Sequence, residues 1–278
     1  MLAVICILTI VGVGSTKLWY ENSVTADTEV AVKEGIEVPI LMYHSVLKDT
    51  NRSGKYVITP SQMEDDLKYL SDNGYTTVFM QELIDYVNGK DELPPKPIVL
   101  TFDDGYYNNY AYVYPLLQKY QAKAVISVVG TYTDAYSENK DENPAYAHLS
   151  WENLKEMQDS GLVEIQNHTY NMHQNDKGRS GCKKRRGESD EQYREVLNKD
   201  IGKLQQEMRE RLNAEAAVFT YPYGSVSEAS FPILRDMGFQ ATLSCQEGMN
   251  YIGKNPEDLY MLRRYLRSNK RSAANILK

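Results

Sequence analysis

The sequence predicts an α/β fold with a parallel sheet, and two observations favour one closed barrel over an open sheet. Short apolar runs alternate with helical patterns along the chain, which is the order expected of successive strand–helix units. At least seven such steps fit into roughly 230 residues, a spacing that suits a single barrel. With 278 residues, 42% of them apolar and 25% charged, the chain has the composition of a globular protein rather than of a disordered or multi-span membrane protein.

The elements follow from apolar periodicity and from residues that start or stop helices. A buried strand is expected over 38–43, with the sequence VPILMY. A helix then begins after Thr59, because Pro60 suits the first helical position and apolar residues recur at helical spacing as far as Leu70. Further strands are predicted over 76–79, 98–102, 124–129, 163–166, 217–221, 241–244 and 260–266, and further helices over 81–87, 108–120, 151–160, 191–212 and 230–237. Two polar stretches without periodicity, 133–148 and 174–190, are predicted to be insertions.

The N-terminal segment differs from the rest of the chain. Leu2 to Gly14 is apolar without interruption, and an acidic, polar stretch extends from Glu21 to Glu37. The apolar run is short for a spanning helix but suits a secretory signal, although it lacks a preceding basic segment and a clear cleavage site. We therefore expect a signal or membrane-anchor segment at 1–20, a polar stalk at 21–37 and one domain at 38–278. An uncleaved anchor is favoured, a buried helix is the alternative, and the protein is expected outside the cytoplasm, anchored or secreted.

Charge and cysteine content narrow the choice of partners. The net charge of -7 argues against nucleic acid as the main partner, because phosphate neutralisation needs a surplus of Lys and Arg. One basic run, Lys183 to Arg186, could meet an anionic wall polymer or lipid headgroups, although a solvated loop is the simpler interpretation. Cys182 and Cys245 could form a disulfide or remain two free thiols. We expect a monomer.

Residues that can bind a metal ion or transfer a proton follow three of the predicted strands. His44 comes after the first strand, the pair Asp103-Asp104 after the strand at 98–102, and His168 and His173 after the strand at 163–166. The carboxyl ends of barrel strands share one rim, so these side chains are expected to converge. Imidazoles and a carboxylate can hold a divalent ion and leave positions open for water and substrate. A second carboxylate beside a cation can stay ionised and act as a base.

Each of these signals is weak when taken alone. Asp-Asp-Gly is commonly a turn, and two histidines five residues apart are more often at the surface than at a metal. Because all of these residues follow predicted strands, a metal or catalytic site is nevertheless the favoured interpretation. His148, in the first insertion, is predicted to be a surface or structural histidine. The 22 Tyr residues, against 5 Phe, could pack on sugar rings, or they could reflect compositional bias alone.

Three segments also resemble the motifs of a known family. The segments TFDDG at 101–105, EIQNHT at 164–169 with His173, and FTYPYG at 219–224 are similar, in this order, to the first three motifs of the polysaccharide deacetylases, carbohydrate esterase family 4. The resemblance spans roughly residues 38–267. It implies a distorted (β/α)7 barrel with a single catalytic domain that removes N-acetyl groups from sugars.

The resemblance also implies a role for each matching residue. Asp103 would be the general base, and Asp104, His168 and His173 would be ligands of a divalent metal, zinc with Co²⁺ or Ni²⁺ as alternatives. The backbone amide of Tyr223 would help to hold the oxyanion.

Three departures from the usual family pattern matter. Thr220 stands where the third motif usually carries an Arg that tethers the base, and His173 is one residue farther along than usual. The late Leu-x-His motif that supplies the general acid is missing, because no histidine follows His173. These departures, with Met42-Tyr43-His44-Ser45, resemble the branch of poly-β-1,6-N-acetylglucosamine deacetylases, in which the acid comes from the N-terminal strand. The branch therefore implies His44 as the acid.

A cation from elsewhere is needed if Asp103 is to stay ionised. Arg264, on the last predicted strand, is the candidate, with Arg263 as the alternative because a one-residue shift in register exchanges the two. The predicted activity is metal-dependent deacetylation of an N-acetylglucosamine polysaccharide: an exopolysaccharide, peptidoglycan or a chitin-like chain, with the first favoured by the branch. The alternatives are a sugar-binding barrel without turnover and a deacetylase of small acetylated molecules or esters.

Overall fold

The structure is a computed structural model, and it describes residues 35–176 and 178–278. The predicted signal or anchor segment and most of the predicted stalk lie outside these residues. β1 (Ile36–Val38) occupies the last two positions of the predicted stalk and pairs in antiparallel fashion with β13 (Asn250–Ile252), so the folded part begins slightly earlier than expected. Within the described residues, no helix has the length and apolarity needed to cross a membrane.

Seven parallel strands form the central sheet, and its two ends meet. Their order is β12-β11-β8-β7-β6-β2-β14, and β5 (Thr76–Thr77) pairs with β6 outside this row. Leu262, just before β14, bridges Leu243 of β12, while Tyr265 and Leu266 pair with β2. Residues 262–266 therefore close the barrel, and the predicted (β/α)7 fold is confirmed. The strands are β2 (Ile40–Tyr43), β6 (Pro97–Asp104), β7 (Ala124–Val128), β8 (Val163–Asn167), β11 (Val218–Thr220), β12 (Ala241–Leu243) and β14 (Tyr265–Leu266).

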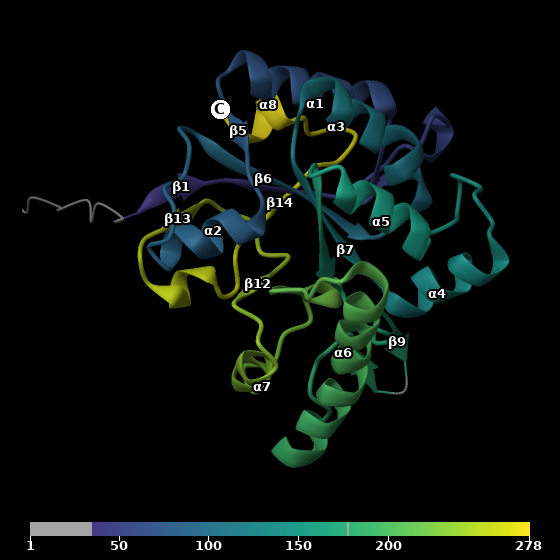
Figure 1. Ribbon diagram of the computed structural model, residues 1–278, viewed down its shortest axis with the longest axis vertical. Coiled ribbons are helices and arrows are strands. Elements are labelled where there is room, and N and C mark those ends of the chain that lie inside the picture. The colour runs from purple at the N-terminus through teal and green to yellow at the C-terminus, as the bar shows by residue number, and fades with distance from the viewer. Residues whose placement is uncertain (1–34, 177) are drawn as a thin grey trace, which may run out of the picture. The chain divides into compact units, whose positions relative to one another are not determined.

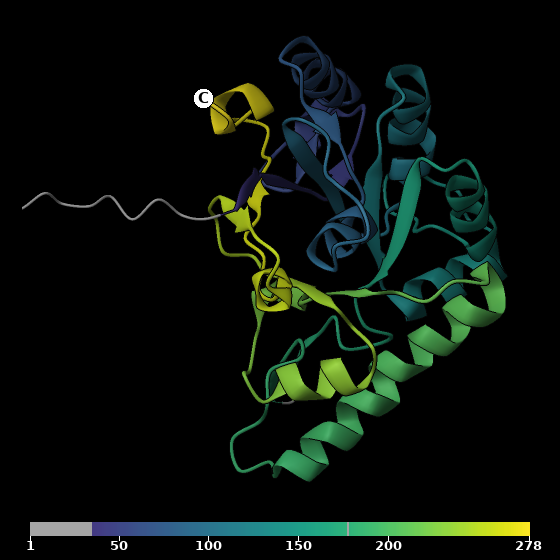
Figure 2. The same cartoon turned by 60° about the vertical axis from the view of Figure 1, so that its left-hand side comes forward.

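Helices cover the outer face of the strands (Figures 1 and 2). Neighbouring strand residues alternate between an inner and an outer core, as the two-residue period of a strand requires. Val99 and Val125 belong to the inner cluster, whereas Leu100 and Ile126 pack in the outer one. Because both faces of the strands are covered, their sequences are almost continuously apolar. The helices are α1 (Pro60–Asp72), α2 (Met80–Val87), α3 (Tyr114–Tyr120), α4 (Gly130–Asn139), α5 (Trp151–Asp159), α6 (Asp190–Leu212), α7 (Ser230–Asp236) and α8 (Ala273–Ile276).

Short elements make up the remainder of the described chain. β3 (Ser45–Val46) pairs with β4 (Val57–Ile58), and β9 (Asn175–Asp176) pairs with β10 (Arg179–Ser180). Three single-turn segments are η1 (Thr50–Arg52), η3 (Pro222–Gly224) and η4 (Pro256–Leu259). The predicted start of α1 is present, since Thr59 caps the helix and Gln62 completes a capping box.

Two predicted segments differ in the structure. The helix expected over 108–120 contains a π-helical turn, η2 (Asn109–Val113), before α3. Pro115 lacks the N–H that an α-helix would direct to Ala111, which accounts for the wider turn. The first predicted insertion, 133–148, is helical over 133–139, where α4 ends. This part was missed because it lacks the apolar stripe by which a helix is recognised in a sequence.

Candidate active site

The carboxyl ends of the strands carry the predicted residues to one rim of the barrel. His44 follows β2, Asp103 and Asp104 end β6, and His168 follows β8. With His173, they line one cavity of about 620 Å³. Met42, Lys55, Tyr56, Tyr106, Tyr223 and Cys245 also line this cavity.

Asp103 is held by a buried arginine from the strand that closes the barrel. Arg264 Nη1 donates to Asp103 Oδ1 at 2.7 Å, and Nη2 donates to Oδ2 at 2.9 Å. The guanidinium is fully buried and also donates to the Ser244 carbonyl at 2.8 Å and to Thr101 Oγ1 at 3.2 Å. Arg263, the alternative partner, is exposed. The structure therefore brings Arg264, and not its neighbour, to Asp103.

The pair keeps Asp103 ionised. Burial alone would raise the pKa of this carboxyl, but the Arg264 guanidinium, with smaller contributions from His168 and His44, brings the pKa below its usual value. A carboxylate held by two parallel hydrogen bonds also has a fixed orientation. Asp103 is thus a preoriented anion at the floor of the cavity.

The neighbouring acid faces two histidines instead of an arginine. Asp104 Oδ1 lies 3.1 Å from His173 Nε2 and 3.5 Å from His168 Nε2, and the three possible ligand atoms lie within 4.8 Å of one another. His168 Nδ1 is 2.8 Å from the Thr220 carbonyl. Because that nitrogen must donate, Nε2 of the neutral ring presents a lone pair to the carboxylate.

This arrangement fits a divalent cation. Asp104 Oδ1 is buried and accepts no hydrogen bond from the described residues, although two ring nitrogens are directed toward it. The lone pairs of neutral rings repel a carboxylate that faces them, and either a proton on a ring or a cation among the three groups relieves this repulsion. Asp104 also has a φ of 70°, a left-handed conformation that Asp tolerates better than most residues and that turns its side chain away from that of Asp103.

The polysaccharide deacetylase family model matches residues 90–242, more than half of the chain. The chain belongs to the polysaccharide deacetylase family. This family is metal-dependent, and the Asp104–His168–His173 cluster is a possible site for the ion.

Three comparisons illustrate the relationship. The chain is 26% identical over 227 residues to the poly-beta-1,6-N-acetyl-D-glucosamine N-deacetylase of Escherichia coli strain K12, covering 75% of this chain and 34% of that protein. It therefore spans about a third of the length of that relative. It is 25% identical over 209 residues to the protein of the same name from Staphylococcus aureus strain MRSA252, covering 75% and 67%. The solved structure of a de-N-acetylase from Aggregatibacter actinomycetemcomitans has a TM-score of 0.73 and 28% identity, covering 87% and 99%.

The structure shows what takes the place of the Arg that is missing from the third motif. Thr220 does not reach Asp103; its hydroxyl lies 2.7 Å from Ser127 Oγ inside the barrel, and its carbonyl holds His168. The position that usually supplies a cation thus orients a histidine here. The cation at Asp103 comes from Arg264 instead.

His44 lies beside the anionic end of the site. Its Nε2 is 3.9 Å from Asp103 Oδ2, and its ring lies 4.8 Å from that of Tyr56. Burial lowers the pKa of His44, and the neighbouring carboxylates of Asp103 and Asp104 partly oppose this shift. His44 Nδ1 is buried without a hydrogen-bond partner among the described residues, so the ring is held by packing rather than by a capping bond.

The side chain of Tyr223 has a position that sequence reasoning missed. Its hydroxyl lies 3.2 Å from His173 Nδ1, and the two rings are 4.5 Å apart. The motif implied a role for the Tyr223 backbone alone. The side chain can also fix the ring of His173, as residues behind metal ligands commonly do.

His148 and the cysteines take no direct part in the cavity floor. His148 packs among Tyr106, Tyr132 and Tyr136, and burial lowers its pKa to about 4, which agrees with a structural histidine. Both cysteines are free thiols: Cys182 is buried, and Cys245 lies at the cavity edge with its sulfur 4.0 Å from Arg264 Nη2.

Proposed function

We propose that this protein is a metal-dependent hydrolase that removes N-acetyl groups from an N-acetylglucosamine-containing polysaccharide. The observation that carries the proposal is the pairing of two unlike acids in one cavity. Asp103 is an oriented anion beside Arg264, and Asp104 faces two imidazoles suited to a metal ion. The names of the relatives from E. coli and S. aureus support a β-1,6-linked exopolysaccharide as the substrate.

The chain's own residues would divide the work of amide hydrolysis. When bound by Asp104, His168 and His173, a divalent ion such as zinc, with Co²⁺ or Ni²⁺ as alternatives, would polarise the acetyl carbonyl and make water more acidic. Asp103 would accept the proton of the attacking water, because its carboxylate is ionised and oriented.

Two further groups would act on the charges that develop. The backbone N–H of Tyr223 would donate to the oxyanion of the tetrahedral intermediate, and preoriented donors of this kind supply much of the stabilisation in acyl transfer. His44 would give a proton to the leaving nitrogen, which leaves poorly as an unprotonated amine. Because His44 lies beside Asp103, the group that accepts a proton from water and the group that donates one to the leaving nitrogen are on the same side of the cavity.

The proposed location is outside the cytoplasm. The apolar run from Leu2 to Gly14 supports a signal or an anchor, and polysaccharides of this kind lie beyond the membrane. The rival interpretation, a sugar-binding barrel without turnover, rested on the missing motif Arg. Arg264 supplies the positive charge that the motif Arg would bring, so the missing motif Arg no longer favours a barrel without turnover.

The test is acetate release from a panel of N-acetylated substrates. We expect release from β-1,6-linked N-acetylglucosamine oligomers, lost after treatment with a chelator and restored by zinc or cobalt. Release from monosaccharides or acetyl esters alone would point to the small-molecule alternative. Oligomer binding without release under any metal would establish the sugar-binding barrel, and activity indifferent to chelation would refute metal dependence.

A further inference from the structure

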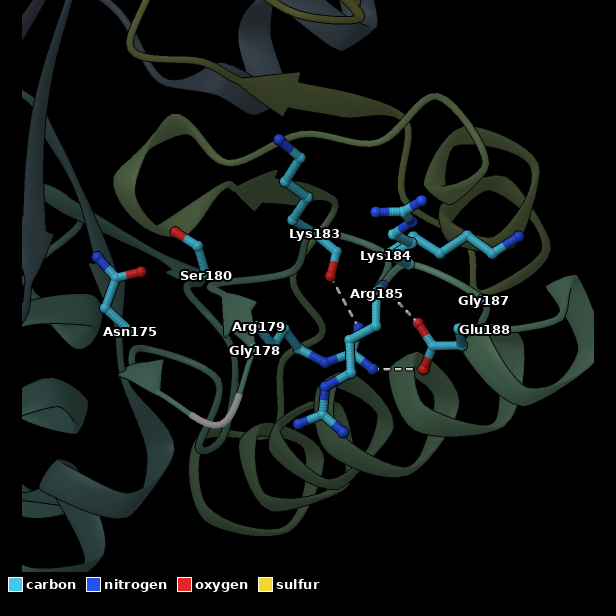
Figure 3. Close-up of a pocket in the computed structure, with 10 residues that line it drawn as sticks. Asn175, Gly178, Arg179, Ser180, Lys183, Lys184, Arg185, Gly187 and Glu188 are labelled. Carbon is cyan, nitrogen blue, oxygen red and sulfur yellow. Dashed lines mark hydrogen bonds and ion pairs between the residues drawn. The ribbon is translucent and has the colours of Figure 1, made fainter.

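A second pocket, of about 790 Å³, lies in the polar segment between β9 and α6 (Figure 3). Among its lining residues, five are Lys or Arg and only Glu188 is acidic. This local surplus of four positive charges stands on a chain whose net charge is -7. We call it the basic pocket; its cations are Arg179, Lys183, Lys184, Arg185 and Arg186.

Two of the five cations are used internally. Arg179 is paired with Glu188, each side chain only 9% exposed, and Lys184 is paired with Asp190. Figure 3 shows Arg179 directed to Glu188, whose other oxygen accepts from the Arg185 backbone N–H at 2.9 Å.

The other three cations are available to a ligand. Lys183, Arg185 and Arg186 are exposed, and their side chains make no hydrogen bond or ion pair with residues 35–176 or 178–278. A solvated basic loop would leave these charges on a mobile segment, so the question is whether the pocket is held in shape.

Contacts with another segment hold the pocket in shape. Ser180 Oγ lies 2.8 Å from Ser225 Oγ, and the Lys184 N–H donates to Ser227 Oγ at 3.0 Å. Gly181, with a φ of 51°, packs so closely that a Cβ there would lie 2.7 Å from the Pro222 carbonyl oxygen. The pocket is therefore preorganised on residues 222–227.

The same segment belongs to the candidate active site. Tyr223 follows Pro222 directly and lines the cavity of Asp103, while Asn175, in the wall of the basic pocket, is two residues from His173. The two sites are therefore built on the same two segments, 173–175 and 222–227.

We propose that the basic pocket binds carboxylate or phosphate groups carried by the polysaccharide, at sugars beside the one that is deacetylated. This inference rests on the proposed function and narrows its substrate to a glycan with anionic substituents. Guanidinium groups bind such oxyanions with two parallel hydrogen bonds. An anionic membrane offers similar chemistry, but the pocket is held on residues 222–227, the segment that carries Tyr223 into the cavity of Asp103, and this favours a glycan bound in that cavity as the occupant.

The test compares two substrates in the full-length, metal-loaded protein. The substrates are an N-acetylglucosamine hexamer and the same hexamer bearing O-carboxymethyl groups. In the variant Lys183→Gln/Arg185→Gln/Arg186→Gln, we expect KM for the carboxymethylated hexamer to rise about tenfold at low salt, because exposed charge pairs are weak singly but additive. The KM for the neutral hexamer and both kcat values should stay within about twofold.

A charge-matched control excludes a general field effect. Lys68→Gln/Lys199→Gln/Arg211→Gln removes three exposed cations from α1 and α6 and should leave both KM values unchanged. Equal effects of the two triple variants, or no substrate preference in the wild type, would overturn the proposal. The proposal would also be overturned if the first variant lost binding to phosphatidylglycerol vesicles while its KM values stayed unaltered. That result would assign the pocket to a membrane.

Calorimetric titration with the carboxymethylated hexamer separates this proposal from the proposed function. Tight binding that the first variant weakens about tenfold would support the pocket even if neither hexamer released acetate, in which case only the proposed activity would fail. Acetate release from both hexamers with identical KM values, and no difference in titration between wild type and variant, would remove the pocket and leave the activity standing.

Discussion

The two acids at the end of β6 are adjacent in sequence, yet they lie in opposite kinds of environment. On the Asp103 side, both carboxylate oxygens accept hydrogen bonds from Arg264. The guanidinium also donates to the Ser244 carbonyl, to the Thr101 hydroxyl and to the Cys245 sulfur. On the Asp104 side, Oδ1 accepts none, although two imidazoles surround it. One half of the cavity pairs its acid with an arginine of the protein, and the other half is a possible site for a metal ion.

This difference is the one that the proposed roles of Asp103 as base and Asp104 as metal ligand need. The left-handed backbone at Asp104 turns the second carboxylate out of the arginine's reach. Because the arginine satisfies only the first acid, the second remains available to a cation. Substitutions on the two sides should therefore have different consequences.

The largest effect is expected on the incomplete side. Asp104→Asn removes a charged ligand while keeping a residue that tolerates the left-handed conformation. We expect bound metal to be lost and acetate release to fall by about 10⁴-fold, the order supplied by Lewis-acid polarisation. Elemental analysis and initial rates test this. Metal retained at the wild-type level, or near-normal rates, would show that Asp104 is not a ligand.

The next effect concerns stability on the complete side. Arg264→Met leaves a buried, unpaired Asp103 and should lower the free energy of unfolding by roughly 4 kcal/mol at pH 7. Because the pKa of Asp103 is lowered in the native protein, the pair stabilises the fold above the usual carboxyl range, and this contribution is lost as pH falls through the lowered pKa. The difference between variant and wild type should therefore shrink at about pH 3, below the usual carboxyl range.

Urea unfolding of chelator-treated protein at the two pH values measures this difference. Arg263→Met is the matched control, since that side chain is exposed, and it should change stability by less than about 0.5 kcal/mol. Equal losses from the two arginine variants would contradict the assignment of Arg264 as the partner of Asp103.

A smaller change in rate is expected when the base itself is altered. Asp103→Asn should keep full metal occupancy and lose about 10²-fold or more in kcat, as removal of a general base does. The combination of retained metal and lost rate distinguishes it from Asp104→Asn. Near-normal turnover, or loss of metal, would exclude Asp103 as the base.

The smallest effect is a difference between two substrates. His44→Ala should keep its metal and lower the rate on an amide by roughly 10²-fold, because an amine leaves poorly without a proton. An activated aryl ester, whose leaving group needs no proton, should lose less than about threefold. Parallel rate measurements test this, and equal losses on both substrates would assign His44 another role.

The sequence was sufficient to predict the convergence of these residues but not their contacts. Apolar strands followed by Asp, Asp or His placed the side chains at one rim, because strand ends in a barrel share that rim. The choice between Arg263 and Arg264 depended on a one-residue register that periodicity could not resolve, and the packing against Asp103 decides it. No sequence pattern indicated the hydrogen bond between Tyr223 and His173, because this contact depends on how η3 turns.

The same limit applies to the fold. Long, strongly apolar strands such as β6 and β7 were predicted, whereas α4 was not, because its amphipathic pattern is weak. The π-helical turn before α3 depends on a proline whose effect on hydrogen bonding is visible only in three dimensions.

The closing strand has a consequence for the order in which a newly made chain becomes competent. Asp103 and Arg264 are 161 positions apart, so the arginine is synthesised long after the acid. Before the last strand is synthesised, the growing chain contains the acid but not its counter-ion, and burying that acid alone would be costly. The N-terminal strands can pair early, but the catalytic floor is completed only when the final strand docks. Premature termination before Arg264 would therefore yield a protein that has both acids and all four histidines but lacks a stable barrel.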